Sequence, residues 1–377
     1  MAESPQLLHL RQGMQTRPLL IITTRLPPQI CGIGTFSWML ERHWIGDRSQ
    51  HRFLVVENGA HSGAKTGAKV SEFGSNWAAL GQVLDQAGSA DVLLHYAGRG
   101  YHRYGCPLGL SGVVQQWKKK FPTARVFIFF HELPGRLPIF SKHYWLNICN
   151  RRIVRQLTSH ADLVITNTQE HVRTLEKLSH LRNIPCLPVP SNIENVGTEA
   201  SKRERTEFVI FGLPYGRWQT LQTFDNDIRA WQQRGALTKL HLIGPTDNKF
   251  DLRSGALIGS YPASNVVVRH GEVAGEQVSR LLSTARFALT TADELTWSKS
   301  TTLMAFLEHG CVAVTKSKFE FEPLSFSITA GQVTSISDEE LQAQSDAGRE
   351  WYGANADWKV LAGKISELIS NLPLRDS

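Results

Sequence analysis

The sequence predicts two doubly wound α/β domains, each built on a parallel sheet, that face each other across a central cleft. A chain of 377 residues is long for one hydrophobic core and comfortable for two domains. Short, continuous apolar runs recur along it, a pattern typical of strands buried on both faces. Helical patterns lie between these runs, and this alternation indicates βαβ units.

The apolar runs fall into two series of five. The first series is 19–22, 53–56, 92–94, 126–130 and 163–165. The second series is 208–211, 240–243, 266–268, 287–289 and 312–314. Apolar residues at helical spacing predict helices around 149–157, 278–285 and 354–371.

A polar, charged and Pro-containing stretch at 188–205 separates the two series and is typical of a linker. We therefore expect an N-terminal domain at 1–195 and a C-terminal domain at 205–345. The helix within 346–377 has an apolar stripe but no following strand, so we expect it to pack back on the domains.

The composition excludes several classes of protein. No apolar run approaches the length of about 18 residues that a membrane-spanning helix needs, and the N-terminus lacks the pattern of a secretory signal. Five scattered cysteines without a CxxC, and fourteen histidines without compact ligand spacing, predict no disulfide framework, no metal site and no resident cofactor. A cytoplasmic protein fits best.

The chain is basic, with a formal net charge of +7. Its densest basic runs are 118–120 and 151–155. A solvated face is the simplest interpretation. Attraction to phosphorylated ligands or to an anionic membrane surface is the alternative, and the runs lack the interleaved aromatic residues of a nucleic-acid site.

The segment 287–314 is the most informative part of the chain. It reads as a strand, a polar loop, a helix that begins within 298–302, a glycine stop and another strand. A helix start offers unpaired backbone N–H groups, and Lys299, Ser300 and Thr301 add a cation and two hydroxyls, which favours a phosphate. In the loop, Glu294 could accept two sugar hydroxyls, whereas we expect Glu308 to be a surface charge.

Two loops after strands of the first series could also contact a ligand. Gly32 and Gly34 allow close approach of the backbone, although a tight turn without a ligand is the alternative. His131 and Glu132 follow the run 126–130, where a histidine could hydrogen-bond a substrate oxygen or simply cap the sheet edge.

A third loop of the first half is rich in aromatic and basic side chains. It contains Tyr96, Arg99, Tyr101 and His102, which suit a sugar or another polyol. The alternative is a well-ordered loop whose aromatic rings pack beneath it.

In the second half, Arg217 stands at an expected helix start. It could pair bidentately with a diphosphate, or it could face solvent.

In their order and spacing, these motifs resemble the GT-B glycosyltransferases, in particular the retaining family-four type that uses nucleotide sugars. The likeness covers almost the whole chain and rests on these segments: GIGT at 32–35, HYAGRGYHRYGCPLGL at 95–110, FIFFHELPG at 127–135, ADLVITNT at 161–168, VPSNI at 189–193, IFGLPYGR at 210–217, LHLIGP at 240–245 and GEVAGEQVSRLLSTARFALTTADE at 271–294, with LMAFLEHGCVAV at 303–314.

The resemblance implies an acceptor site in the N-terminal domain and a nucleotide-sugar site in the C-terminal domain. Gly32 and Gly34 would approach the donor phosphates, and His131 would lie beside the transferred sugar. Arg217 would bind the diphosphate, and Lys299, Ser300 and Thr301 would take the phosphate role of the helix start.

The sequence departs from this pattern at two positions. The family carries two glutamates eight residues apart, and the matching positions here are Trp297 and Ala305. Glu294 could substitute for the first glutamate. A lysine expected shortly after Arg217 is replaced by Gln219 or Gln222.

The leading hypothesis is therefore a hexosyltransferase that moves a sugar from a nucleotide-diphosphate donor to an acceptor hydroxyl with retention, without a metal. The partners would be that donor and a carbohydrate, lipid-linked or other hydroxyl acceptor, with peripheral contact at the inner face of the membrane. Alternatives are an epimerase or phosphorylase on the same scaffold and a non-catalytic sugar- or partner-binding protein.

Overall fold

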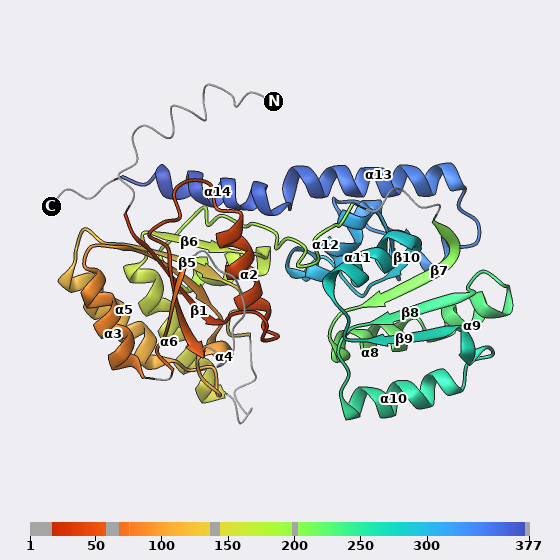
Figure 1. The fold of residues 1–377 in the computed structure, drawn as a ribbon, viewed down its shortest axis with the longest axis horizontal. Coiled ribbons are helices and arrows are strands. Elements are labelled where there is room, and N and C mark those ends of the chain that lie inside the picture. The colour runs from red at the N-terminus through yellow and green to blue at the C-terminus, as the bar shows by residue number, and fades with distance from the viewer. Residues whose placement is uncertain (1–16, 58–67, 75, 136–143, 198–202, 374–377) are drawn as a thin grey trace, which may run out of the picture. The chain divides into compact units, whose positions relative to one another are not determined.

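The computed structural model describes residues 17–57, 68–74, 76–135, 144–197 and 203–373. The chain divides into two compact units (Figure 1). Unit 1 consists of residues 1–187 and 361–377, and unit 2 consists of residues 188–360.

Unit 1 contains a six-stranded parallel sheet with the order β3-β2-β1-β4-β5-β6. Its strands are β1 (Leu19–Arg25), β2 (Arg52–Glu57), β3 (Lys69–Glu72), β4 (Asp91–Tyr96), β5 (Arg125–Phe130) and β6 (Leu163–Thr166). Its helices are α2 (Gly32–Arg42), α3 (Trp77–Ala87), α4 (Gly98–Tyr101), α5 (Leu108–Lys120), α6 (Tyr144–His160) and α7 (Gln169–Leu178), with most of α14 (Trp358–Ser370).

Unit 2 repeats this topology. Its parallel sheet has the order β12-β11-β10-β7-β8-β9. The strands are β7 (Glu204–Phe211), β8 (Lys239–Ile243), β9 (Val267–Gly271), β10 (Ala285–Leu289), β11 (Val312–Thr315) and β12 (Ile328–Thr329). The helices are α8 (Pro214–Thr223), α9 (Asp225–Gln233), α10 (Asn248–Gly259), α11 (Gly275–Thr284), α12 (Thr301–His309) and α13 (Asp338–Asn355).

Read from its first strand, each sheet has the doubly wound order 3-2-1-4-5-6 of a Rossmann domain. The order reverses between β1 and β4 in unit 1 and between β7 and β10 in unit 2. Ligands of open α/β sheets bind outside the carboxyl ends of the strands at such a switch point. The loops after these four strands are therefore the places to examine for a site.

The strands were predictable because their burial is continuous. Every residue of β4 and of β5 is buried, so both faces of the sheet select apolar side chains. The sequence missed β3, which is an edge strand with no buried residue, and β12, which has only two residues. The predicted two-domain α/β class is confirmed.

The helix expected at 354–371 is present as α14, whereas α13, which precedes it, was not predicted. Residues 361–377 belong to unit 1. Arg125 on β5 donates a hydrogen bond to the carbonyl of Ile369, 3.3 Å away, which fastens α14 to the unit 1 sheet. The first boundary lies at residue 187, earlier than the predicted 195.

Among the residues that the structure describes, the helices are too short or too polar to cross a lipid bilayer.

Candidate functional site

The start of α12 has the geometry that the sequence predicted. Ser300 is the N-cap, and its hydroxyl accepts a hydrogen bond from the backbone N–H of Leu303 at 3.1 Å. The first bond within the helix joins the N–H of Met304 to the carbonyl of Ser300. The N–H groups of Thr301 and Thr302 therefore lie outside the helical ladder and point out of the helix start.

The cation before this helix start and the glycine that ends the helix were also predicted. Lys299 is exposed in the short 3₁₀ turn Trp297–Lys299 that leads into α12. Gly310 ends the helix in the left-handed conformation, with φ of 69°. The helix start therefore combines a local cation with N–H groups and hydroxyls, which is a favourable arrangement for an anion.

Gly212 brings the end of β7 against this helix start, and Gly244 brings the end of β8 against Gly212. Gly212 follows β7 with φ of +129°, and a Cβ atom there would lie 3.2 Å from the Thr302 hydroxyl. Gly244 follows β8 with φ of +132°, and a Cβ atom there would lie 2.1 Å from the carbonyl oxygen of Gly212. Side chains are thus excluded from a backbone-lined surface at the unit 2 switch point.

Arg217 on α8 is buried rather than solvent-facing, so that alternative was wrong. The residue is 1% exposed, and its guanidinium carbon lies 4.2 Å from the centre of the Phe250 ring. One Nη atom donates to the carbonyl of Pro245, while Nε is buried without a hydrogen-bond partner. Burial lowers the pKa of Arg217 to about 10, so the side chain stays charged at neutral pH.

The position of Arg217 relates it to the glycine surface. A Cβ atom on Gly244 would lie 3.4 Å from its Nε atom, so the guanidinium lies directly behind the turn that follows β8. Its positive charge thus reaches the carboxyl edge of the sheet. Direct pairing with a diphosphate stays a prediction.

The loop before α12 is shaped by Asp293 rather than by Glu294. The Asp293 carboxylate accepts hydrogen bonds from the N–H of Leu295 at 3.1 Å and from the hydroxyl of Thr296 at 2.6 Å. Glu294 itself is exposed. Its predicted role on a sugar stays a prediction.

The two positions where the resemblance expects glutamates carry apolar side chains, of which Ala305 is buried and Trp297 is partly buried. The Trp297 ring meets the Trp351 ring edge to face, with centroids 5.8 Å apart, and Ala305 is fully buried beside Phe306. At position 305 a carboxylate would bury a charge in an apolar cluster.

In unit 1, the two predicted glycines behave differently. Gly32 begins α2, is exposed and has open space at its Cβ position. A Cβ atom on Gly34 would lie 1.3 Å from the carbonyl oxygen of Arg25, so this glycine allows α2 to lie against the end of β1. The predicted alternative, a tight turn without a ligand, therefore accounts for Gly34, whereas Gly32 is accessible to a ligand.

His131 directly follows β5 and belongs to a buried histidine pair. Its Nε2 atom lies 3.1 Å from Nδ1 of His95 on β4, and its ring stacks on Phe129 with centroids 4.5 Å apart. Burial lowers the pKa of His131 well below its usual range and lowers that of His95 to about 3. Both rings are therefore neutral near neutral pH and share one proton in this hydrogen bond.

The unpaired atom of His95 identifies the favoured tautomer. His95 Nε2 is buried and has no hydrogen-bond partner. A buried acceptor without a hydrogen-bond partner costs less free energy than a buried N–H donor without one. We therefore assign the proton of His95 to Nδ1 and leave Nε2 unprotonated. His95 then donates to His131 Nε2, and the proton of His131 lies on its Nδ1 atom.

The aromatic loop of unit 1 is packed from beneath by its own tyrosines. The Tyr96 hydroxyl donates to Oδ1 of Asn150 at 3.1 Å, and the Tyr101 hydroxyl donates to the carbonyl of His95 at 2.7 Å. Both rings are buried. His102 accepts backbone N–H groups of its own loop through Nδ1.

Of the predicted acceptor-binding residues, Arg99 and Glu132 are the exposed ones. Both follow strands that end at the carboxyl edge of the unit 1 sheet. The acceptor roles of all five residues stay predictions.

Glu308 is not the surface charge that we expected. Its Oε2 atom is buried without a hydrogen-bond partner, and the side chain lies near Ser191 and Tyr352. Burial, with a smaller contribution from Asp357, raises the pKa of Glu308 to about 7. Sequence spacing gave no sign of this, because the covering residues come from distant parts of unit 2.

The sequence also contains an Asp-x-Asp motif that was not predicted as a site, Asp225-Asn226-Asp227. At this spacing two carboxylates can share a cation. The structure places the motif at the start of α9, where Arg229 pairs with Asp225 at 3.0 Å and Lys316 pairs with Asp227 at 2.7 Å. Within the described part of the chain, no cluster of three or more His, Cys, Asp or Glu side chains is arranged to hold a metal ion.

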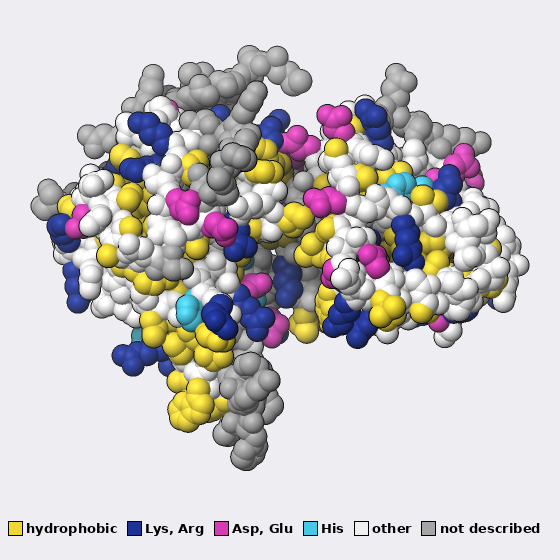
Figure 2. Space-filling view, turned by 60° about the horizontal axis from the view of Figure 1, so that its bottom comes forward, with side chains coloured by type: hydrophobic (Ala, Val, Ile, Leu, Met, Phe, Trp, Pro, Cys, Tyr) yellow, Lys and Arg dark blue, Asp and Glu magenta, His cyan; other side chains and the backbone are white. Residues whose placement is uncertain are grey.

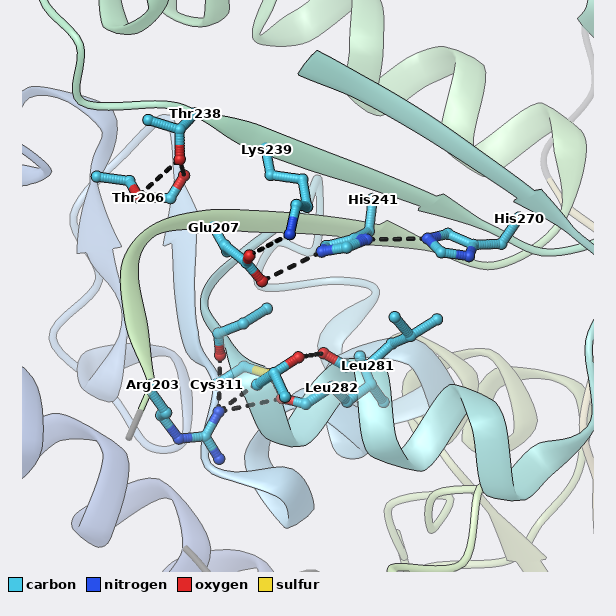
Figure 3. Close-up of polar contacts among 12 residues, drawn as sticks. Arg203, Thr206, Glu207, Thr238, Lys239, His241, His270, Leu281, Leu282 and Cys311 are labelled. Carbon is cyan, nitrogen blue, oxygen red and sulfur yellow. Dashed lines mark hydrogen bonds and ion pairs between the residues drawn. The ribbon is translucent and has the colours of Figure 1, made fainter. Parts of the chain in front are cut away.

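A second histidine pair, which the sequence did not reveal, lies on the unit 2 sheet (Figure 3). His241 on β8 bonds His270 on β9 at 2.9 Å and Glu207 on β7 at 3.3 Å. Burial alone would raise the pKa of Glu207, but hydrogen bonds from Lys239 and His241 hold it below its usual range. Glu207 and Lys239 lie toward the amino ends of their strands, away from the switch point.

No family model matches the sequence, and no curated protein matches it. Solved structures do match. A sucrose-phosphate synthase from Thermosynechococcus elongatus is 12% identical with a TM-score of 0.67, over 95% of this chain and 99% of that one. Anabaena HepE, solved in complex with UDP and glucose, is 12% identical with a TM-score of 0.67, over 95% of this chain and 100% of that one.

The N-terminal domain of a trehalose-6-phosphate phosphatase from Candida albicans is also similar. It is 13% identical with a TM-score of 0.65, over 93% of this chain and 96% of that one. The chain therefore has the GT-B fold, as the resemblance implied. Identities this low show the fold alone, and proteins with different activities share it.

Proposed function

We propose that this protein is a glycosyltransferase that moves a sugar from a nucleotide-diphosphate donor to an acceptor hydroxyl. The observation that carries the proposal is the start of α12 at the unit 2 switch point. There, the N–H groups of Thr301 and Thr302 and the Ser300 hydroxyl adjoin a surface that Gly212 and Gly244 keep free of side chains. A diphosphate fits this combination of N–H groups and open backbone.

The same groups would do most of the chemistry. Negative charge develops on the diphosphate as it leaves the sugar, and fixed donors aimed at it lower the barrier. Lys299 supplies an exposed cation, and Arg217 adds a buried positive charge behind the Gly244 turn. With these charges in place the transfer needs no metal and no resident cofactor, and we propose that it retains the sugar configuration.

Unit 1 would hold the acceptor. His131 lies at the carboxyl edge of the sheet with its Nδ1 proton as a neutral donor to a sugar or acceptor oxygen, while Arg99 and Glu132 are exposed at the same edge. We propose a cytoplasmic protein of polysaccharide or glycolipid synthesis whose acceptor is a carbohydrate or a lipid-linked hydroxyl, in peripheral contact with the membrane.

Two observations favour other functions. The partly buried Trp297 and the buried Ala305 stand where the two glutamates are expected, which favours a non-catalytic sugar- or partner-binding protein. An epimerase or phosphorylase would instead need acid–base carboxylates, for which the exposed Glu132 and Glu294 are the candidates.

The release of nucleoside diphosphate from a panel of nucleotide sugars, with and without sugar or glycolipid acceptors, tests the proposal. Lys299→Ala removes one charge-assisted contact to phosphate and is expected to lower turnover by about tenfold to a hundredfold. Lys177→Ala, at another exposed lysine, on α7 in unit 1, is the matched control and should leave turnover unchanged. Nucleotide binding without any release would support the non-catalytic alternative.

A further inference from the structure

One long segment of unit 1 is nearly devoid of negative charge. Between Asp91 and Asp162 the sequence carries eleven Lys and Arg residues and a single carboxylate, Glu132. The segment therefore has a larger positive excess than the +7 of the whole chain. Three of its cations are neutralised locally, because Lys118 pairs with Asp162, Lys120 pairs with Asp85 and Arg125 pairs with Asp91.

The outer face of α6 combines this charge with exposed apolar side chains. Trp145 is 76% exposed and Ile148 is 43% exposed, and Arg152 and Arg155 follow on the same face. The spacing of three, four and three residues keeps these four side chains in one stripe of about 15 Å. The sequence of α6 contains no Asp or Glu.

The loop before α5 extends this stripe. Tyr104 is 52% exposed with the Arg103 guanidinium 4.4 Å from its ring centre, and Leu108 at the start of α5 is 54% exposed. The loop is held against α6, because Cys106 donates to the carbonyl of Leu146 at 3.4 Å. In Figure 2, hydrophobic side chains gather at the lower end of unit 1, with Lys and Arg side chains beside them.

We propose that this surface, formed by Arg103, Tyr104, Leu108, Trp145, Ile148, Arg152 and Arg155, docks unit 1 on an anionic lipid bilayer. Aromatic and aliphatic tips enter the boundary between headgroups and acyl chains, while arginines along the same face pair with anionic headgroups. An acidic protein would complement the charge, but it would not need an exposed tryptophan and isoleucine at the tip of the helix.

The place of the surface in the sheet suggests what it is for. The helices α5 and α6 start at the carboxyl edge of the unit 1 sheet, the edge at which β5 ends and His131 lies. Docking would bring that edge toward the lipid headgroups. If the proposed glycosyltransferase function holds, on which this step rests, the acceptor hydroxyl belongs to a membrane-anchored molecule rather than to a soluble sugar.

Co-sedimentation of the full chain with vesicles tests the docking directly. The protein should bind vesicles of equal parts phosphatidylglycerol and phosphatidylcholine, bind pure phosphatidylcholine weakly, and dissociate as salt is raised. A basic residue near an anionic surface strengthens binding about fivefold, so R152E/R155E should weaken it by at least about twentyfold. Trp145→Ala should weaken binding to both kinds of vesicle.

Matched variants test whether vesicle binding depends on this particular surface. They control for the change in net charge and for the loss of an exposed apolar side chain elsewhere. R173E/R234E makes the same change in net charge at exposed arginines of α7 and of the end of α9, and Leu252→Ala truncates a 78% exposed leucine of α10. Both should bind vesicles as the unchanged protein does. All substituted residues are exposed, and circular dichroism with a melting curve verifies that each variant folds.

Absence of binding to anionic vesicles would overturn the docking proposal, and so would an equal loss of binding in R152E/R155E and R173E/R234E. Self-association that depends on Trp145, without vesicle binding, would identify a second copy of the chain as the occupant and would also overturn it. Vesicle binding without sugar transfer to any acceptor would leave the docking intact and count against the proposed function alone.

Discussion

Glu308 makes stability depend on pH in a way that an ordinary glutamate would not. Its side chain lies on α12 with Oε2 buried, and burial raises its pKa from 4.5 to about 7. Between these two values the folded protein keeps a proton that the unfolded chain releases. The free energy of unfolding therefore falls as pH rises from about 4.5 to about 7.

The size of the effect follows from the shift in pKa. The change from 4.5 to about 7, at about 1.4 kcal/mol per unit, corresponds to a loss of about 3 kcal/mol above pH 7. Glu308→Gln keeps the shape of the side chain and removes its charge. This variant should match the unchanged protein near pH 5 and exceed it by about 3 kcal/mol at pH 8.

Thermal unfolding of the two proteins at pH 5 and pH 8 measures the difference. For a unit of this size, about 3 kcal/mol corresponds to a rise of roughly 6 to 12 °C in the melting temperature of unit 2. Glu350→Gln, at an exposed position of α13, is the matched control and should leave both melting temperatures unchanged. If Glu308→Gln and the unchanged protein have the same melting temperature at pH 5 and also at pH 8, the conclusion that Glu308 is buried and protonated is refuted.

Two further predictions concern unit 1. Gly34→Ala would place a Cβ atom against the carbonyl of Arg25 and should destabilise unit 1 by about 3 kcal/mol in urea unfolding. Gly112→Ala, in open space on α5, should instead stabilise it by about 0.5 to 1 kcal/mol, and equal effects would contradict the close packing. His95→Phe removes the donor to His131 Nε2, so ¹⁵N NMR should show the proton of His131 leaving Nδ1 in part of the population. His270→Phe should not change that tautomer, and an unchanged tautomer in His95→Phe would count against the assignment.

Local signals in the sequence were sufficient for the α12 helix start. The sequence placed the helix start within 298–302 and its end at a glycine, and the structure has Ser300 as the N-cap and Gly310 as the C-cap. Continuous apolar runs were likewise sufficient for the strands, because both faces of each sheet are covered. The edge strand β3 was not predicted, because its residues are exposed or partly exposed and do not form a continuous apolar run.

Burial at single polar positions was not predictable, because residues far apart in the chain create it. Arg217 is covered by Pro245 and Phe250, and Glu308 lies near Ser191 and Tyr352. The sequence indicated that these side chains are charged, but not what lies over them. The histidine pair of His95 and His131 is of the same kind, since it forms only when β4 and β5 lie side by side.

The central claim is that the start of α12 binds the diphosphate of a nucleotide sugar. The most direct test is a thermal-shift titration of the purified protein with UDP, GDP, ADP and their sugar conjugates, because a ligand that binds only the folded state raises the melting temperature. We expect one nucleotide to raise it, and Lys299→Ala to abolish or strongly reduce the shift while Lys177→Ala retains it. Absence of a shift with every nucleotide, or an equal shift in Lys299→Ala, would contradict a donor site at this helix start.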